Sequence, residues 1–268
     1  MSLFAPDYYS KFKCIADKCK NNCCIGWEID IDDDTMDFYK DKSDIIKHIE
    51  ISPTPHFKLV DNDRCPFLNN SNLCEIINCY GEDNLCQICS DHPRFRNFFE
   101  SRTEIGLGMC CEAAVDLILN NDFNLIEIEK YVEKENTEEN EFFNYRNNIL
   151  KKQPEELMLL LPAINLNELY SVLNNMEKLN INRDTVISVL KNDTRKISEV
   201  NLFDKVKFKR IFDYFIFRHL HTESLEFCVL ATYIIASFGT DINENARIFS
   251  SEIEYSDENT DILFDILT

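Results

Sequence analysis

Residues 13–30, KCIADKCKNNCCIGWEID, place four cysteines within eleven positions, at Cys14, Cys19, Cys23 and Cys24. Seven more cysteines follow before residue 112, and Cys228 is the only one after it. Crowded reduced thiols are prone to oxidation. The pattern therefore indicates that these cysteines are either paired with one another or bound to a metal.

The composition favours a metal over disulfides. With 268 residues, of which 44% are hydrophobic, the chain can bury a core without disulfide support. Its first residues lack the charged region and apolar run of a secretory signal, and its most apolar stretch, residues 227–238, is too short to span a bilayer. We therefore expect a cytoplasmic protein with no membrane segment, and in a reducing cytosol clustered cysteines bind metals.

The formal net charge of −20 argues against a nucleic-acid partner, because the chain has no excess of Lys and Arg to neutralise phosphates. The simplest interpretation is a solvated acidic surface. Attraction of a cationic partner, such as a lysine-bearing protein, stays open as an alternative.

Two parts of the chain differ in pattern, and together they predict a mainly α fold. Residues 1–119 contain frequent turn signals between short helical or extended pieces, which predicts a loop-rich, cysteine-cluster metal-binding domain. Residues 120–268 predict a helical domain, because apolar residues recur there at helical spacing. The predicted helical stretches are residues 32–50 in the first part and, in the second, 154–164, 165–179, 184–192, 203–220 and 225–238.

The spacing of the cysteines predicts four-thiolate sites of the kind that hold Zn²⁺ or iron–sulfur clusters. Cys86 and Cys89, two residues apart, can reach one metal, whereas neighbours such as Cys23 and Cys24 rarely bind the same ion. One member of each adjacent pair is therefore expected to be the ligand. This leaves two sites of four thiolates, or one site with redox-active spares, and Cys79 and Cys228 are the expected non-ligands. The predicted ligands are Cys14, Cys19, Cys23, Cys24, Cys65, Cys74, Cys86, Cys89 and Cys110, with Cys111 as the alternative to Cys110.

The metal itself is left open between zinc and an iron–sulfur cluster, for which a 4Fe-4S cluster is the favoured form. The Cys65-Pro66 step occurs next to ferredoxin-type clusters. Radical chemistry on S-adenosylmethionine requires three cysteines with three and then two intervening residues. Cys19 and Cys23 begin that pattern, but Gly26 stands at the third position.

Four of these motifs together resemble the flagellin lysine-N-methylase family, which is related to cysteine-cluster proteins described as zinc- or iron-chelating. They are FKCIADKCKNNCCIGWEIDID, CPFLNNSNLCEI, GEDNLCQICSDHPR and CEAA, and they cover about residues 9–119. The family pattern has cysteines at the positions of all nine predicted ligands. The resemblance implies S-adenosylmethionine-dependent methylation of lysine side chains of flagellin, or of another lysine-bearing protein. The alternative is a non-enzymatic metal-binding module whose helical domain binds a partner.

A methyl-donor site is not visible in the sequence, and no catalytic or donor-binding residue is predicted. The best match to a glycine-rich donor turn is EIGLGMC, residues 104–110, but no clear buried strand precedes it. Any donor is therefore expected on a scaffold other than the doubly wound nucleotide-binding fold. His219 and His221 are two residues apart on a predicted helix, and we interpret them as surface or capping residues.

Overall fold

The computed structural model describes residues 2–130, 136–179, 182–239 and 241–267. Its packing divides the chain into two compact units. Residues 13–94 form one, here called the cysteine unit, and residues 1–12 together with 95–268 form the other, here called the helical unit. The predicted boundary after residue 119 differs from this division. Strand β1 (Ser2–Pro6) pairs with β5 (Arg102–Leu107) and β6 (Leu125–Glu129), which joins the first residues to the helical unit.

The cysteine unit consists of short elements, as the frequent turn signals predict. Its helix α1 (Asp33–Tyr39) starts at the N-cap Asp32, whose carboxylate accepts a hydrogen bond from the Thr35 amide at 2.9 Å. The predicted helical stretch 32–50 contains α1 and α2 (Ser43–Ile46), separated by residues 40–42. The other elements are η2 (Ala16–Lys18), β2 (Ile49–Glu50), β3 (His56–Phe57), α3 (Glu75–Tyr80), η3 (Glu82–Asn84) and α4 (Gln87–Asp91).

A small core holds these elements together. Its buried residues include Ile29, Tyr39, Phe57 and Phe67, and two of the predicted metal ligands, Cys65 and Cys86, lie in the same core. The thiols therefore lie inside the cysteine unit rather than on loops around it.

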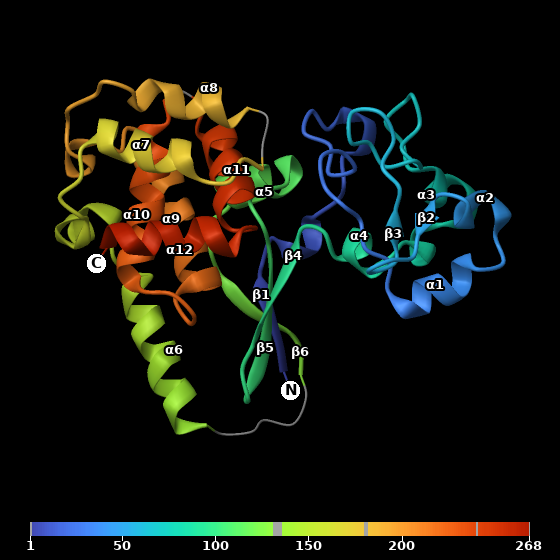
Figure 1. The fold of residues 1–268 in the computed structure, drawn as a ribbon. Helices are drawn as coiled ribbons and strands as arrows, with labels where there is room; N and C mark the ends of the chain where they lie inside the picture. The colour runs from blue at the N-terminus through green and yellow to red at the C-terminus, as the bar shows by residue number, and fades with distance from the viewer. Residues whose placement is uncertain (1, 131–135, 180–181, 240, 268) are drawn as a thin grey trace. The chain divides into compact units, whose positions relative to one another are not determined.

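The helical unit contains a four-stranded mixed sheet of order β4-β5-β1-β6, with β4 at Arg94–Phe98 (Figure 1). β1 runs parallel to β5 and antiparallel to β6. The fold is thus mostly α with a mixed sheet, and this sheet is not predicted from the sequence. β1 finds its partner about a hundred positions away, and residues 104–107 of β5 are all buried, so the strand lacks the alternation that marks a half-exposed strand.

Gly106 explains why EIGLGMC is not a donor turn. Residues 104–107 of the segment belong to the buried strand β5, and a Cβ on Gly106 would stand 2.7 Å from Cε1 of Phe95 and 2.9 Å from Cε1 of Phe217. Glycine is required here because two aromatic rings pack directly against the strand backbone.

Helices make up the rest of this unit, and every stretch predicted as helical after residue 150 forms a helix. The most deeply buried is α10 (Leu225–Ser237), in which residues 227–236 are all buried. The stretch 154–164 forms a 3₁₀ helix, η4 (Pro154–Leu160), rather than an α-helix. The remaining elements are η1 (Tyr9–Lys11), α5 (Glu112–Asn120), α6 (Thr137–Ile149), α7 (Leu166–Asn175), α8 (Arg183–Ile187), η5 (Ser188–Leu190), η6 (Ile197–Glu199), α9 (Lys205–His219), α11 (Ile242–Ile253) and α12 (Asp257–Leu267).

A buried ion pair fixes the sheet to α6. Glu104 of β5 is fully buried and accepts two hydrogen bonds from the Arg146 guanidinium, at 2.7 and 2.6 Å. Arg102 approaches the same carboxylate at 2.5 Å. This two-pronged geometry is specific, and removal of one partner would leave a buried charge uncompensated.

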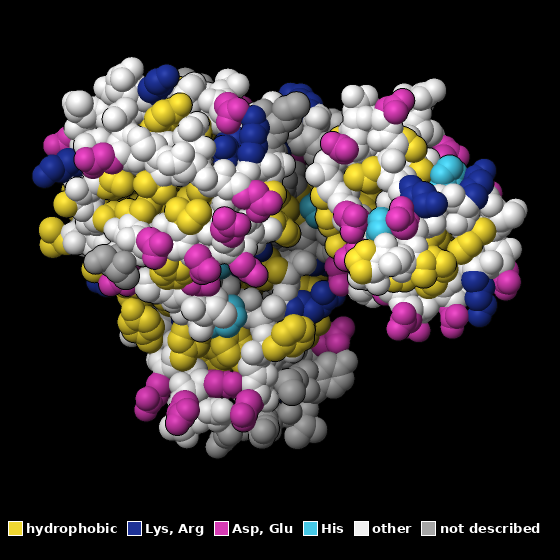
Figure 2. Space-filling view, viewed as in Figure 1, with side chains coloured by type: hydrophobic (Ala, Val, Ile, Leu, Met, Phe, Trp, Pro, Cys, Tyr) yellow, Lys and Arg dark blue, Asp and Glu magenta, His cyan; other side chains and the backbone are white. Residues whose placement is uncertain are grey.

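The surface agrees with the acidic composition. On the face drawn in Figure 2, acidic side chains are scattered over both units rather than gathered into one patch. Among the described residues, no helix is both long and apolar enough to cross a bilayer.

Candidate metal centre

Apart from Cys23, which precedes Cys24 in the sequence, five cysteines of the cysteine unit lie close enough for the charge on one sulfur to raise the pKa of another. The hydrogen bond with Cys23, followed by burial and the charges of Cys23, Cys65 and Cys74, raises the pKa of Cys24. Burial, and the charges of Cys74 and Cys86, act in the same direction on Cys65. Cys89 in turn is affected by Cys86, Cys24 and Cys65. The chain brings together sulfurs that are up to 65 positions apart, and we call this set the five-thiol cluster: Cys24, Cys65, Cys74, Cys86 and Cys89.

Short local structures position each thiol of the five-thiol cluster. Cys74 and Cys86 are the N-caps of α3 and α4, and Cys89 lies one turn into α4, so that its sulfur is 3.5 Å from that of Cys86. The amide of Cys65 donates to the carbonyl of Cys24 at 2.8 Å, which fixes these two loops against each other.

Backbone amides point at two of the sulfurs. Those of Phe67 and Leu68 donate to the Cys65 thiol, and those of Ile76 and Ile77 donate to the Cys74 thiol, which lowers the pKa of both groups. Burial outweighs this effect, so the pKa of Cys65 rises to about 11 and that of Cys74 also rises. Hydrogen bonds to sulfur are a common feature around thiolate-bound metals, where they stabilise negative charge.

In each of two hydrogen-bonded thiol pairs, the pKa of one thiol is lowered and that of the other is raised. The hydrogen bond between Cys86 and Cys89 lowers the pKa of the first and raises that of the second. The bond between Cys23 and Cys24 acts in the same way, with Cys23 lowered. Several buried sulfurs cannot all become anions without a cation nearby, so the donor set fits a soft cationic metal in kind. As the sulfurs are placed, however, no three His, Cys, Asp or Glu side chains of the described residues form a set that holds a metal ion.

Of the other predicted ligands, Cys23 is hydrogen-bonded to Cys24 of the five-thiol cluster. Cys14 is exposed and Cys19 is half-buried, both within the cysteine unit. Cys110 belongs to the helical unit, where its thiol bonds to the Tyr255 hydroxyl at 3.1 Å and burial raises its pKa to about 12. Of the two expected non-ligands, Cys79 is exposed on α3 and Cys228 is fully buried in α10.

Asp32 is a positioning residue that the sequence does not single out. Besides capping α1, its carboxylate accepts a hydrogen bond at 2.7 Å from the amide of Gln87, the first residue of α4. Burial raises the pKa of Asp32, but the donors from Gln87 and Thr35 outweigh it and hold the pKa below its ordinary value. One carboxylate thus joins the starts of two helices, and α4 carries Cys89.

Trp27, the only tryptophan, lies next to the cluster. Its indole N–H donates to the carbonyl of Cys23, and its ring centroid is 6.3 Å from that of His92. Burial, followed by the charge of Arg94, lowers the pKa of His92 to about 4, so this side chain is neutral at pH 7. The fluorescence of Trp27 should therefore report on the structure around the five-thiol cluster.

In the helical unit, His219 is not a surface residue as interpreted from the sequence. Its Nε2 lies 2.5 Å from Oε1 of the buried Glu254, which also accepts hydrogen bonds from Tyr214 and pairs with Arg218. Burial raises the pKa of Glu254, but these partners, Arg218 first, lower it to about 2. The network joins α9 to the end of α11, because Tyr214, Arg218 and His219 come from α9 and Glu254 caps α11.

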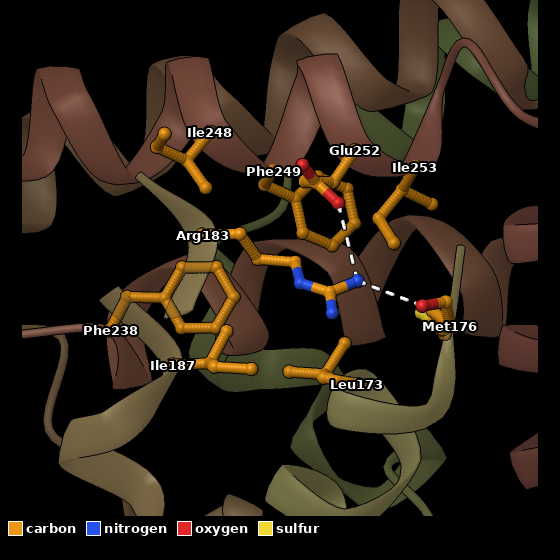
Figure 3. A pocket seen from close by; sticks show the side chains of 9 residues that line it. All are labelled: Leu173, Met176, Arg183, Ile187, Phe238, Ile248, Phe249, Glu252 and Ile253. Carbon is orange, nitrogen blue, oxygen red and sulfur yellow. Dashed lines mark hydrogen bonds and ion pairs between the residues drawn. The ribbon is translucent and has the colours of Figure 1, made fainter. Parts of the chain in front are cut away.

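A cavity between α7, α8 and α11 does not offer a ligand site. Figure 3 shows Arg183 extending into it among apolar side chains, with its guanidinium bonded to Glu252 at 3.4 Å and to the Met176 carbonyl at 3.0 Å. The volume is only about 10 Å³, which is no more than one water molecule occupies.

Comparisons with known proteins agree with the cysteine motifs. The chain is 25% identical to the lysine-N-methylases of Salmonella typhimurium and of Salmonella choleraesuis, over 130 residues in each case. The match covers 43% of this chain and 32% of each relative, so the chain spans about a third of their length. It is also 26% identical over 128 residues to the flagellar biosynthetic protein FliU of Salmonella muenchen, covering 43% of this chain and 76% of that protein. No family model and no solved structure matches. Over this segment the chain is similar to proteins named lysine-N-methylase and to a flagellar biosynthetic protein, which agrees with the family resemblance of its cysteine motifs.

Proposed function

We propose that this chain is a protein lysine N-methyltransferase that uses S-adenosylmethionine and acts on flagellin or another lysine-bearing protein. The observation that carries the proposal is the relationship to two proteins named lysine-N-methylase, together with one named as a flagellar biosynthetic protein. The acidic surface supports it, because a net charge of −20 attracts lysine-bearing partners.

The same proposal includes an iron–sulfur cluster, or a zinc ion, bound by four thiolates of the five-thiol cluster. Their softness, their proximity and the amide donors at Cys65 and Cys74 support it. Bound there, the metal would supply positive charge that lets the thiols ionise, and it would connect α3 and α4 with the loops at Cys24 and Cys65.

The donor is proposed to bind on a scaffold unlike the doubly wound nucleotide-binding fold. That fold needs a mostly parallel sheet and a glycine-rich first turn. The sheet described here has four strands, of which β1 pairs in parallel with β5 and antiparallel with β6, and Gly106 lies within a strand.

A second candidate is a metal-binding module without enzymatic activity, whose helical unit binds a partner. The observation that favours it is that all members of the five-thiol cluster lie within residues 13–94, while the match covers only a third of the lysine-N-methylases. The metal site and the methylating activity are therefore separate questions.

One experiment distinguishes the two candidates. The chain is purified without oxygen, its iron, sulfide and zinc contents are measured, and it is incubated with S-adenosylmethionine and purified flagellin. Mass spectrometry of flagellin should show added methyl groups on lysine residues. A metal-loaded chain that leaves the mass of flagellin unchanged would rule out flagellin as the substrate and favour the second candidate.

A further inference from the structure

A hollow of about 280 Å³ opens in the helical unit between the end of α6, the middle of α9 and the segment before β6. Its walls are partly apolar and partly polar, and they consist of Phe123, Asn124, Leu125, Asn147, Leu150 and Asp213. Pockets for drug-sized ligands range from about 300 to 1,000 Å³. This hollow is therefore suited to one amino-acid side chain rather than to a nucleoside-containing donor.

The polar end of the hollow is built around Asp213, whose side chain is 10% exposed. One of its oxygens, Oδ1, accepts from the ammonium of Lys209, which also donates to the Leu150 carbonyl at 2.9 Å. The second oxygen, Oδ2, has no partner among the described residues, and neither has the side-chain amide of Asn147. A solvent-accessible oxygen of a largely buried carboxylate and the amide of Asn147 are thus left to receive a ligand.

Two ion pairs flank the hollow, and the carboxylate of Asp7 accepts a hydrogen bond from the side-chain amide of Asn124 at 3.2 Å. Lys209 pairs with Asp213, and Arg210 pairs with the nearby Asp122 at 2.9 Å. The phenol of Tyr8 also lies close to Asp213, and burial followed by this negative charge raises the pKa of Tyr8, so it stays protonated. An ammonium that entered the hollow would be a second cation beside Lys209 and would share the single carboxylate of Asp213 with it.

We infer that this hollow binds the side chain of a substrate lysine, with its methylene stem along the apolar walls and its amine at Oδ2 of Asp213. The inference rests on the proposed function, for which it names the acceptor pocket. The apolar walls and the charge of Lys209 disfavour a second ammonium, so the bound lysine gives up a proton to solvent and binds as the neutral amine. Its nitrogen then carries the free electron pair that acceptance of a methyl group requires.

The electrostatics of Asp213 suit this role. Burial raises its pKa to about 6 even though Lys209 opposes the shift, and Asp122 adds to it. The carboxylate is therefore ionised above neutral pH and can accept a hydrogen bond from the amine.

The test uses a small probe, so that it needs neither methyl donor nor activity. Nα-acetyl-lysine amide is titrated into the full chain by NMR, and Nα-acetyl-norleucine amide, which lacks the amine, is the matched control ligand. The lysine probe should shift signals of residues 123–125 and 147–150, and its affinity should rise from pH 7 to pH 9 because the free ammonium must lose a proton to bind. The norleucine probe should bind at least about tenfold more weakly, as expected for the loss of hydrogen bonds to a charged group.

Two variants make the test specific. Asp213→Asn should weaken the lysine probe about tenfold or more. Asn147→Trp should abolish binding by filling the hollow, and since Asn147 is exposed the variant should still fold. Asn140→Trp is its control, because Asn140 is exposed on the same helix about 10 Å away along its axis.

Equal affinity for the two probes, or unchanged binding by Asn147→Trp, would overturn the inference. Failure of the proposed function looks different. If the lysine probe binds as expected and flagellin is never methylated, the inferred lysine-binding site is supported and the proposed methylation of flagellin is refuted. If flagellin is methylated equally well by Asn147→Trp, the activity stands and the hollow is not its acceptor pocket.

Discussion

Replacing Asp32 by alanine should destabilise the cysteine unit by about 2–4 kcal/mol, through hydrogen bonds to Thr35 and Gln87. The carboxylate accepts hydrogen bonds from the Thr35 amide and hydroxyl, both at 2.9 Å, and from the Gln87 amide at 2.7 Å. Alanine removes all three. The variant therefore tests whether one side chain fixes α4, and with it Cys89, against α1.

The magnitude follows from two contributions. Loss of an N-cap costs about 1 kcal/mol, and a hydrogen bond to a charged group contributes about 1.5–3 kcal/mol. For a unit of this size, about 4–8 °C of melting temperature is lost for each kcal/mol. Asp32→Asn should have an intermediate effect, because an amide has one acceptor oxygen where the carboxylate uses two.

Urea and thermal unfolding of the full chain, followed by the fluorescence of Trp27, measure this effect where it occurs. Asp34→Asn is the matched control, because Asp34 is exposed in the first turn of the same helix. Since the pKa of Asp32 is lowered in the folded state, its contribution is present above its unfolded pKa of about 3.9 and is lost as pH falls through the folded value. The difference between wild type and Asp32→Asn should therefore shrink in acid. An unfolding midpoint of Asp32→Ala equal to that of Asp34→Asn would refute the reasoning.

Three further predictions concern the thiols and the sheet. Removal of metal by a strong chelator should change the fluorescence of Trp27, while the far-UV circular dichroism of the helices largely remains. An unchanged Trp27 signal after verified metal loss would show that the thiols do not organise the cysteine unit. Elemental analysis should show that Cys79→Ser and Cys228→Ser keep the metal content of the wild type. Serine at any one of the four predicted ligand positions should lower the metal content; these positions are Cys65, Cys74, Cys86 and Cys89. Full retention of metal in all four of those variants would contradict the ligand set. Gly106→Ala should destabilise the helical unit by about 1–3 kcal/mol through overpacking, as measured by calorimetry. Phe95→Leu should recover part of that loss in the double variant, and no recovery would mean that the Phe95 ring is not the obstacle.

The sequence predicts elements whose signals are local. The helix α7 has an apolar stripe and a reciprocal cap in which Asn165 and Glu168 bond each other's backbone, and α10 is a continuous apolar run. The sheet has no such signal. β1 is five residues long, and its pairing with β5 is decided by contacts about a hundred positions away.

The candidate sites divide in the same way. Spacing predicts that thiols such as Cys86 and Cys89 share a site, because two intervening residues fix their separation locally. Which other sulfurs join them depends on the paths of loops that no periodicity describes. The hollow at Asp213 could not be predicted, since a single carboxylate in the helical stretch 203–220 does not show that α6 and residues 123–125 surround it.

The two units differ in what holds them together, and this decides how a loss of activity should be interpreted. The helical unit has a large apolar core that includes nine of the ten consecutive buried residues of α10, Thr232 being the exception. The core of the cysteine unit is much smaller, and it includes Cys65 and Cys86. Their sulfurs lie near that of Cys89, and the pKa values of Cys65 and Cys89 are raised. A metal there would contribute folding free energy directly to a unit that buries little apolar surface. If the chain methylates flagellin as proposed, a cysteine variant that loses this activity therefore implicates the thiol in chemistry only if Trp27 shows that the cysteine unit is still folded.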